Sequence, residues 1–393
     1  MARPLRILVA PDSFGGALDS VGVARAIGAG WMRGRPQDSV QAAPMADGGE
    51  GTLAAVAAAL GDGVELRTAL VHDPLDRPIE ASWLALEGGQ AAFIEMAAAS
   101  GLALLAPGEV TPASARIATT RGTGELLRAA LDAGVERVTI GLGGSATTDG
   151  GTGMLAALGV RFVDASGAAL PAGGAALARL ASIDLSGADR RLAGMDITLA
   201  SDVTNPLTGP AGAAATYGPQ KGADADAVAE LDAALTKYGM AVEASTGRAV
   251  ADLAGAGAAG GTGAGLLAFM QATLRPGFEV VAELIGLPEL LAGADLVLTG
   301  EGRADEQTLA GKAAMGVASL AAQRATPVVL LCGTLGPGSE ALEASGLFRL
   351  VQPIADRPMA LAEAMADTER QLANAAERLA RSVDIGLVLA ELG

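Results

Sequence analysis

The sequence predicts an α/β protein built on a doubly wound parallel sheet. Short apolar runs that read as buried strands alternate with amphipathic or alanine-rich stretches that read as helices, which is the order typical of parallel sheets. Polar, glycine-rich loops follow several of these strands. In open α/β sheets, ligands bind beyond the carboxyl ends of the strands, so we expect the functional site in these loops.

The N-terminal region gives the first strand, loop and helix. Residues 6–10 are apolar enough for a buried strand, and residues 11–16 form a polar loop. A helix is expected over 20–31, because apolar residues recur there at a spacing of four. A second polar glycine loop at 44–52 precedes a helix that ends near residue 60.

The same signals predict the rest of the chain. The prolines at 73–78 interrupt the alternation, and we therefore expect a domain inserted between two α/β regions. The nearly pure Gly/Ala stretch 255–265 is either a flexible hinge or a ligand loop. Strands are expected over 79–96 (two strands), 138–142, 196–200, 295–299, 327–332 and 347–351, and helices over 123–133, 154–158, 224–246, 266–274 and 361–380.

Composition and charge restrict the classes of function. The chain has 393 residues, enough for two domains, and a net charge of −17. No basic stripe with interleaved aromatic residues occurs, which argues against nucleic acid as a partner. One cysteine and one histidine exclude a disulfide framework and a Cys/His zinc site. With no apolar run long enough for a membrane span and no signal peptide, we expect a cytoplasmic protein without a membrane partner.

Carboxylates gather in the loops that follow the predicted strands. Carboxylates beside cations and amide-rich loops are the parts of a Mg²⁺-assisted phosphoryl transfer, and a carboxylate can serve as the base for a substrate hydroxyl. The carboxylates are Asp12, Asp47 with Glu50, Asp149, Asp202, and Glu301 with Asp305, and the cations are Arg303, Lys312 and Lys221.

The most informative stretch is 138–159, in which a strand, a loop and the start of a helix follow one another. Gly143 and Gly144 let the backbone approach a ligand closely, and Ser145 offers a hydroxyl. The N-terminus of the helix that follows is a natural anion site, because its free N–H groups point outward. Asp149 is either a metal ligand or an N-cap of that helix.

Several motifs, taken in order, resemble the bacterial glycerate kinases of the first type. They cover the chain from about residue 7 to 333. Any one glycine motif is weak in a chain with 55 glycines, whereas the ordered set is specific. The matching segments are 10–14, 45–52, 122–126, 141–147 through Gly153, 201–210, 217–222, 260–266, and 298–303 through Gly311 and Lys312.

The resemblance implies ATP-dependent phosphorylation of D-glycerate to 2-phosphoglycerate, with Mg²⁺. It also implies a discontinuous Rossmann-like domain, a second α/β domain inserted in it, and an active site in the cleft between them. The expected boundaries are 1–75 together with 285–393 for the Rossmann-like domain, and 76–284 for the inserted domain. The oligomeric state stays open, with a homodimer as one option.

We assign roles to the candidate residues as hypotheses. Asp202 is a metal ligand or the base that orients the glycerate hydroxyl, with Asn205 in support, and Asp47 is a second carboxylate near Mg²⁺. The family commonly has a lysine where Gly15 and Gly16 stand, so the resemblance implies that Arg303 or Lys312 takes over its contact. Phosphate or substrate is expected to bind at Gly143, Gly144, Ser145, Asp12, Ser13 and Glu301, and Arg303 and Lys312 are expected to meet the glycerate carboxylate or the moving phosphoryl group.

Two other classes of function stay open at the level of the sequence. A nicotinamide-dependent oxidoreductase of a small hydroxy acid would use Gly261–Gly265 for the dinucleotide, although the usual N-terminal fingerprint is absent. A non-catalytic protein that binds small organic acids would not need so many clustered carboxylates. A Walker-type ATPase is disfavoured, because the P-loop pattern is absent.

Overall fold

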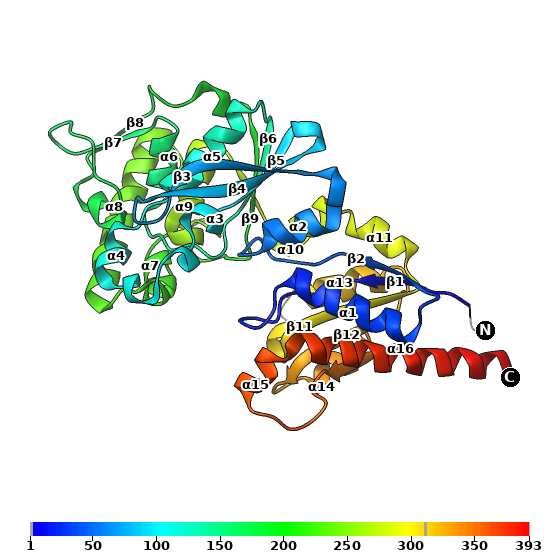
Figure 1. Ribbon diagram of the computed structural model, residues 1–393. Helices are drawn as coiled ribbons and strands as arrows, with labels where there is room; N and C mark the ends of the chain where they lie inside the picture. The colour runs from blue at the N-terminus through cyan, green and yellow to red at the C-terminus, as the bar shows by residue number, and fades with distance from the viewer. Residues whose placement is uncertain (1–2, 310–312, 393) are drawn as a thin grey trace. The chain divides into compact units, whose positions relative to one another are not determined.

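A computed structural model describes residues 3–309 and 313–392 (Figure 1). The fold is mixed α/β with parallel sheets, which confirms the predicted class. The chain divides into two compact units, and each is described separately. Unit 1 comprises residues 1–46, 54–61 and 278–393, and unit 2 comprises 47–53 and 62–277.

Unit 1 is built on a five-stranded parallel sheet with the strand order β13-β12-β11-β1-β2. The chain passes from β1 to β2 and later returns to the other side of β1 as β11. The topological switch point of this sheet therefore lies between β1 and β11, where ligands of such sheets bind. The strands are β1 (Arg6–Val9), β2 (Ser39–Ala42), β11 (Leu296–Ala304), β12 (Val328–Leu335) and β13 (Leu350–Pro353).

Helices cover both faces of this sheet. Ile7 and Val9 pack with α1 and α16 in one apolar cluster. Leu8, which points to the opposite face, is also buried. A Cβ added to Gly30 of α1 would lie 2.0 Å from the Ala373 carbonyl oxygen of α16, so the close contact of these helices requires glycine. The helices are α1 (Ser20–Gly34), α2 (Thr52–Leu60), α10 (Gly277–Leu284), α11 (Leu287–Gly293), α12 (Glu306–Leu309), α13 (Ala313–Ala322), α14 (Glu340–Ala344), α15 (Leu361–Ala366) and α16 (Thr368–Leu392).

Unit 2 contains a six-stranded sheet with the order β10-β9-β6-β5-β4-β3. The strands β5, β6, β9 and β10 are parallel, so their carboxyl ends meet at one edge. The strands β3 and β4 extend the sheet in an antiparallel manner. The strands are β3 (Glu65–His72), β4 (Pro78–Leu86), β5 (Ala91–Glu95), β6 (Arg137–Gly141), β9 (Asp196–Ala200) and β10 (Thr273–Arg275), with a separate pair β7 (Arg161–Val163) and β8 (Ser182–Asp184).

The core of unit 2 combines the sheet with several helices and the glycine-rich stretch. That stretch forms the helix α9, whose first residues include Ala259–Gly261 with left-handed backbone angles. Nearly all of α9 is buried, which contradicts both a flexible hinge and an open dinucleotide loop at Gly261–Gly265. The helices are α3 (Ala97–Ser100), α4 (Pro112–Ile117), α5 (Arg121–Asp132), α6 (Thr152–Ala157), α7 (Ala213–Tyr217), α8 (Ala225–Thr246) and α9 (Ala258–Phe269).

The structure differs from the sequence-based expectation in a few elements. The helix expected over 361–380 is two helices, α15 and α16. The strands β2, β3, β7, β8 and β10 were not expected, and the helix expected over 266–274 is the end of α9, which stops at Phe269. The strand β3 belongs to unit 2 because it pairs with β4 along its whole length. Across residues 3–309 and 313–392, no helix is long and apolar enough to cross a membrane.

Candidate active site

One group of predicted site residues lies at the carboxyl ends of β1 and β11 in unit 1. The Asp12 amide donates to the Gly300 carbonyl oxygen at 2.8 Å, and the Asp12 carboxylate accepts the Ser13 amide at 2.6 Å. Glu301 follows Gly300 directly on β11. The structure therefore brings Asp12, Ser13 and Glu301 to the switch point of the sheet, where a ligand is expected.

The β11 end of this group is held by side-chain contacts. The Glu301 carboxylate is buried and accepts the Thr308 hydroxyl at 2.7 Å. The exposed Arg303 guanidinium forms an ion pair with Asp305, with 2.9 Å between Nε and Oδ2. Arg303 is thus available at the surface, although part of its charge is compensated. Lys312 lies outside the described residues.

A second group lies in unit 2, where the segment 47–53 crosses the carboxyl ends of the parallel strands. The Gly143 amide donates to the Gly48 carbonyl oxygen at 3.1 Å. A Cβ added to Gly141 would lie 2.5 Å from that same oxygen, and one added to Gly48 would lie 2.6 Å from the Ala200 carbonyl oxygen. Real Cβ atoms do not approach backbone this closely, so the glycines allow the segment to lie directly on β6 and β9.

Glu95, which the sequence-based reading did not single out, anchors the segment 47–53. Its carboxylate ends β5 and accepts the backbone amides of Gly51 at 3.1 Å and Leu53 at 2.8 Å. Burial raises the pKa of this carboxyl, and the two amide hydrogen bonds oppose the rise. Glu95 therefore positions the loop that carries Asp47. In the sequence it is simply the last residue of an apolar strand, so no local signal marks its role.

Asp47 and Asp202 both adjoin Gly277. The Gly277 amide donates to Asp202 Oδ1 at 2.8 Å. A Cβ on Gly277 would lie 1.7 Å from the Asp47 carbonyl oxygen. Asp47 Oδ1 accepts the Gly49 amide at 3.1 Å, and the side chains of Asp47 and Asp202 are exposed. The structure thus brings the backbone of Asp47 and the carboxylate of Asp202, the two residues that the sequence assigned to a metal, to the same glycine.

Asp47 and Asp202 suit a magnesium ion that takes its other ligands from phosphate groups and water. In the part of the chain that the structure describes, no group of three or more His, Cys, Asp or Glu side chains could hold a metal. Mg²⁺ is commonly held by one or two carboxylates, with phosphate oxygens and water as its other ligands. Asp47 and Asp202 match this donor set, so they could hold a magnesium ion that arrives with a nucleotide.

The backbone amides of the loop 143–149 differ in whether they already donate a hydrogen bond within the protein. The Gly143 amide is occupied by Gly48, as described above, so it is not free for a phosphate as expected from the sequence. For the amides of Gly144 and Ser145, no acceptor is found within the described residues, and Gly144 is exposed. Anion binding by this loop would therefore depend on Gly144 and Ser145.

The expectation that the helix after this loop binds an anion is wrong. The buried Asp149 carboxylate accepts the amides of Gly151 and Gly153 at 3.1 Å each. It also accepts the amide and the hydroxyl of Thr120, both at 2.9 Å. The Met154 amide donates to the Thr120 hydroxyl at 2.8 Å. Asp149 is thus the internal anion of this helix N-terminus, a capping role.

The Asn205 side chain bonds to residues that follow it in the chain. Its amide nitrogen donates to the Ala211 carbonyl oxygen at 2.8 Å, and its amide oxygen accepts the Tyr217 hydroxyl at 2.8 Å. The side chain therefore ties the 201–210 loop to Ala211 and to Tyr217 of α7. These bonds give Asn205 a structural role in this loop, and its support of Asp202 stays a prediction.

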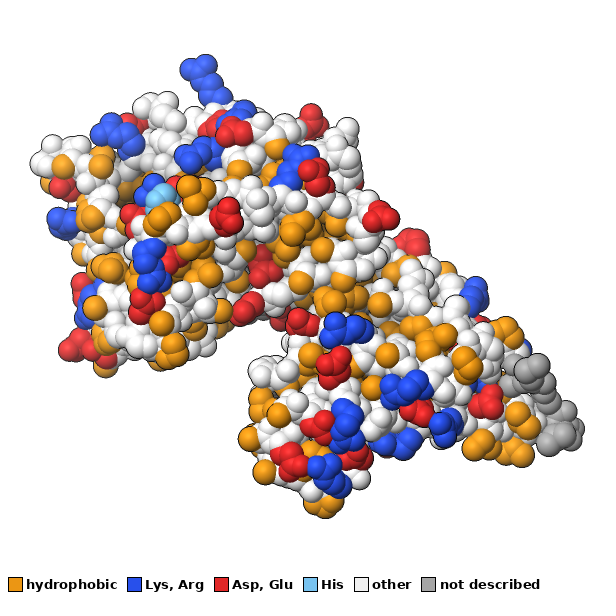
Figure 2. Space-filling model, viewed as in Figure 1, with side chains coloured by type: hydrophobic (Ala, Val, Ile, Leu, Met, Phe, Trp, Pro, Cys, Tyr) orange, Lys and Arg blue, Asp and Glu red, His pale blue; other side chains and the backbone are white. Residues whose placement is uncertain are grey.

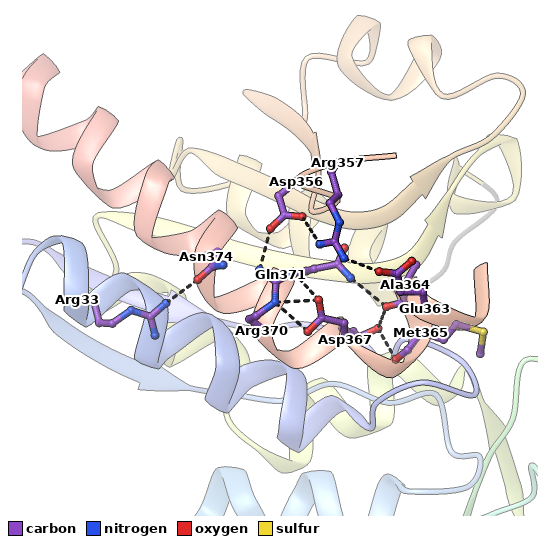
Figure 3. Close-up of polar contacts among 11 residues, drawn as sticks. Arg33, Asp356, Arg357, Glu363, Ala364, Met365, Asp367, Arg370, Gln371 and Asn374 are labelled. Atoms are coloured by element: carbon purple, nitrogen blue, oxygen red, sulfur yellow. Dashed lines mark hydrogen bonds and ion pairs between the residues drawn. The ribbon is translucent and has the colours of Figure 1, made fainter. Parts of the chain in front are cut away.

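A groove of about 800 Å³ on unit 1 lies between α1 and the α15–α16 junction. Arg370, one of its lining residues, contacts Asp356 and Asp367 (Figure 3). Two further arginines of the groove, Arg25 and Arg33, pair with Glu369 and Glu377 of α16. Over this face, basic and acidic side chains are interspersed (Figure 2). The arginines of the groove are therefore already paired with carboxylates, and these ion pairs connect α1 with α16.

Comparison with known proteins identifies what this architecture is similar to. The family model described as the glycerate kinase family matches residues 7–384. A glycerate kinase of Bacillus subtilis (strain 168) is 44% identical over 385 residues, which cover 96% of this chain and 99% of that protein. A glycerate 2-kinase of Escherichia coli (strain K12) is 45% identical over 334 residues, covering 84% of this chain and 86% of that protein.

A solved structure gives the same result. The crystal structure of a protein assigned as glycerate kinase 2 from Salmonella typhimurium LT2 superposes with a TM-score of 0.84. The two sequences are 42% identical, and the match covers 98% of this chain and 99% of that one. At this identity and coverage, the likeness extends over both units.

Proposed function

The chain belongs to the glycerate kinase family and is a kinase that uses ATP, and from this premise we propose that it phosphorylates D-glycerate at the 2-hydroxyl. The products are 2-phosphoglycerate and ADP. The name of the Escherichia coli relative, glycerate 2-kinase, supports this choice of hydroxyl.

One observation carries the proposal, namely the meeting of Asp47 and Asp202 at Gly277. Phosphoryl transfer needs a group that accepts the hydroxyl proton and a means to offset the charge of the phosphates. The exposed side chains of Asp47 and Asp202 would supply the first requirement and a site for a cation that meets the second.

We assign the proton-accepting role to Asp202. The glycerate hydroxyl oxygen forms a bond to the γ-phosphorus of ATP, the bond from that phosphorus to the β-phosphate oxygen breaks, and ADP leaves. The hydroxyl proton passes to the Asp202 carboxylate, which its bond from the Gly277 amide holds in place. Asp47 and Asp202 would hold Mg²⁺, which neutralises the phosphate charge when it is bound.

The unit 1 group is proposed to bind substrate. Asp12 and Ser13 offer a carboxylate, a hydroxyl and backbone groups at the switch point, and the exposed Arg303 offers a guanidinium to a carboxylate or a phosphoryl group. The role of Lys312 stays a prediction from the sequence. We also propose that the enzyme works in the cytoplasm, and a homodimer stays a prediction.

An ADP-release assay with D-glycerate tests the function. Purified protein, ATP and Mg²⁺ are coupled to an ADP-consuming enzyme pair, with lactate and tartrate as control acids. We expect ADP release that requires D-glycerate, and a phosphorus NMR spectrum of the product that shows the phosphate on the carbon next to the carboxylate. The absence of ADP release with D-glycerate would refute the proposal, and a phosphate on the terminal carbon would refute the assigned hydroxyl.

A further inference from the structure

A buried lysine lies beneath the loop 143–149 in unit 2. Lys221 ends a short 3₁₀ helix, Pro219–Lys221, and is only 3% exposed. Its ammonium donates to Ser145 Oγ at 2.9 Å and to the Thr147 carbonyl oxygen at 2.7 Å. Both acceptors are neutral, and a buried ammonium with neutral acceptors alone is costly.

The charge of Lys221 has no ion-pair partner among the described residues. Burial lowers the pKa of Lys221 to about 7, and the negative charge of Asp149 opposes this shift through space. The Asp149 carboxylate is itself bonded to the amides of Gly151 and Gly153 and to Thr120. The positive charge at Lys221 therefore lacks a directly bonded anion.

The hydrogen-bond directions around Lys221 leave several donors unused. Because Ser145 Oγ accepts from the ammonium, its own hydroxyl hydrogen is directed elsewhere. The amides of Gly144 and Ser145 have no acceptor within the described residues. The Thr147 hydroxyl is buried without a hydrogen-bond partner. Free amides and a buried hydroxyl without a partner, next to a charge without an ion pair, are the features of a site that receives an anion.

We propose that Lys221 is a positioning residue that makes Gly144 and Ser145 the receptor for an anionic group of one substrate. That group is either the carboxylate of glycerate or a phosphoryl group of ATP. The ammonium fixes the Ser145 hydroxyl as a donor and supplies the charge behind it, while the contacts to the anion come from Ser145 and Gly144. This inference rests on the proposed function, which supplies the two anions.

The proposal has a pH dependence of definite sign. The free protein loses the Lys221 proton near pH 7, whereas a bound anion favours the charged form and keeps the proton to higher pH. Binding therefore takes up a proton above pH 7, and KM for that substrate rises by up to about tenfold per pH unit. The other titratable groups around the loop are Asp149, Tyr238, Glu50 and Glu95, and burial raises the pKa of Tyr238 so that it stays neutral.

Steady-state kinetics of the full chain test the proposal. KM and kcat are measured for D-glycerate and for ATP between about pH 6 and pH 9, in the wild type, Lys221→Met and Lys221→Arg. Lys237, an exposed lysine bonded to a backbone carbonyl, gives the matched control Lys237→Met. We expect Lys221→Met to raise one KM about tenfold or more near pH 6.5 and to remove its pH dependence. Lys221→Arg stays charged and is expected to keep a low KM at high pH.

The outcomes separate the two substrates and the two proposals. A change confined to the glycerate KM identifies the carboxylate as the bound anion, and one confined to the ATP KM identifies the phosphoryl group. Unchanged KM values, or a wild-type pH dependence that persists in Lys221→Met, overturn the inference. If Lys221→Met does not fold, Ser145→Ala decides, because its KM must exceed that of the wild type near pH 6.5 and approach it at pH 9. A wild type without glycerate-dependent ADP release refutes the proposed function instead.

Discussion

The two groups of site residues are assembled mainly by different kinds of contact. At the ends of β1 and β11 in unit 1, charged side chains are held by other side chains, as Thr308 holds Glu301 and Asp305 holds Arg303. At the ends of β6 and β9 in unit 2, backbone lies on backbone, and glycines allow the contact. The geometry of the unit 1 group should therefore depend on its side-chain bonds, and that of the unit 2 group on glycines that leave no room for even one methyl group.

The largest effect is expected from Asp202→Asn in unit 2. Asparagine keeps an oxygen for the Gly277 amide but cannot accept the hydroxyl proton at neutral pH, so kcat should fall by about 100- to 10,000-fold. The ADP-release assay measures this, with thermal unfolding to confirm that the protein is folded. Asp252→Asn, at an exposed carboxylate of the same unit, is the matched control. A folded Asp202→Asn enzyme within tenfold of wild-type turnover would show that the base lies elsewhere.

The next effect is expected from Gly277→Ala. The new Cβ would lie 1.7 Å from the Asp47 carbonyl oxygen, so the backbone around Asp47 or Asp202 must move by more than an ångström. A misplacement of this size costs on the order of 100-fold in rate. Gly108→Ala is the control, because a Cβ at Gly108 meets no atom within 4 Å. Equal kcat values for the two alanine variants would contradict the idea that backbone contact builds this part of the site.

The sequence predicted the parts of the fold that depend on local pattern. The helix α8 was expected over 224–246 and is observed over Ala225–Thr246, with Asp224 as its N-cap. The loops that carry Asp12 and Asp202 were expected at the carboxyl ends of strands and lie there. Apolar runs, spacing of four and capping residues act within a few positions, so a single sequence contains them.

The features that the sequence did not predict depend on partners far along the chain. Glu95 accepts amides more than 40 positions away, and Asp149 takes the Thr120 donors that turn an apparent anion site into an internal cap. The Gly/Ala stretch looked flexible by composition, yet a Cβ on Gly260 would lie 2.0 Å from the Thr147 carbonyl oxygen. Its glycines serve close packing, which local composition does not distinguish from mobility.

The smallest effect is expected from Thr308→Val in unit 1. This variant tests whether side-chain bonds hold the unit 1 group. Valine keeps the shape of threonine but removes the hydroxyl bonded to the buried Glu301 carboxylate, which should lower the free energy of unfolding by about 1–3 kcal/mol. Urea unfolding measures this. Thr334→Val, whose exposed hydroxyl makes one long contact of 3.4 Å, should change stability far less. If the two valine variants unfold alike, side-chain bonds do not hold this end of β11, and the contrast between the units fails.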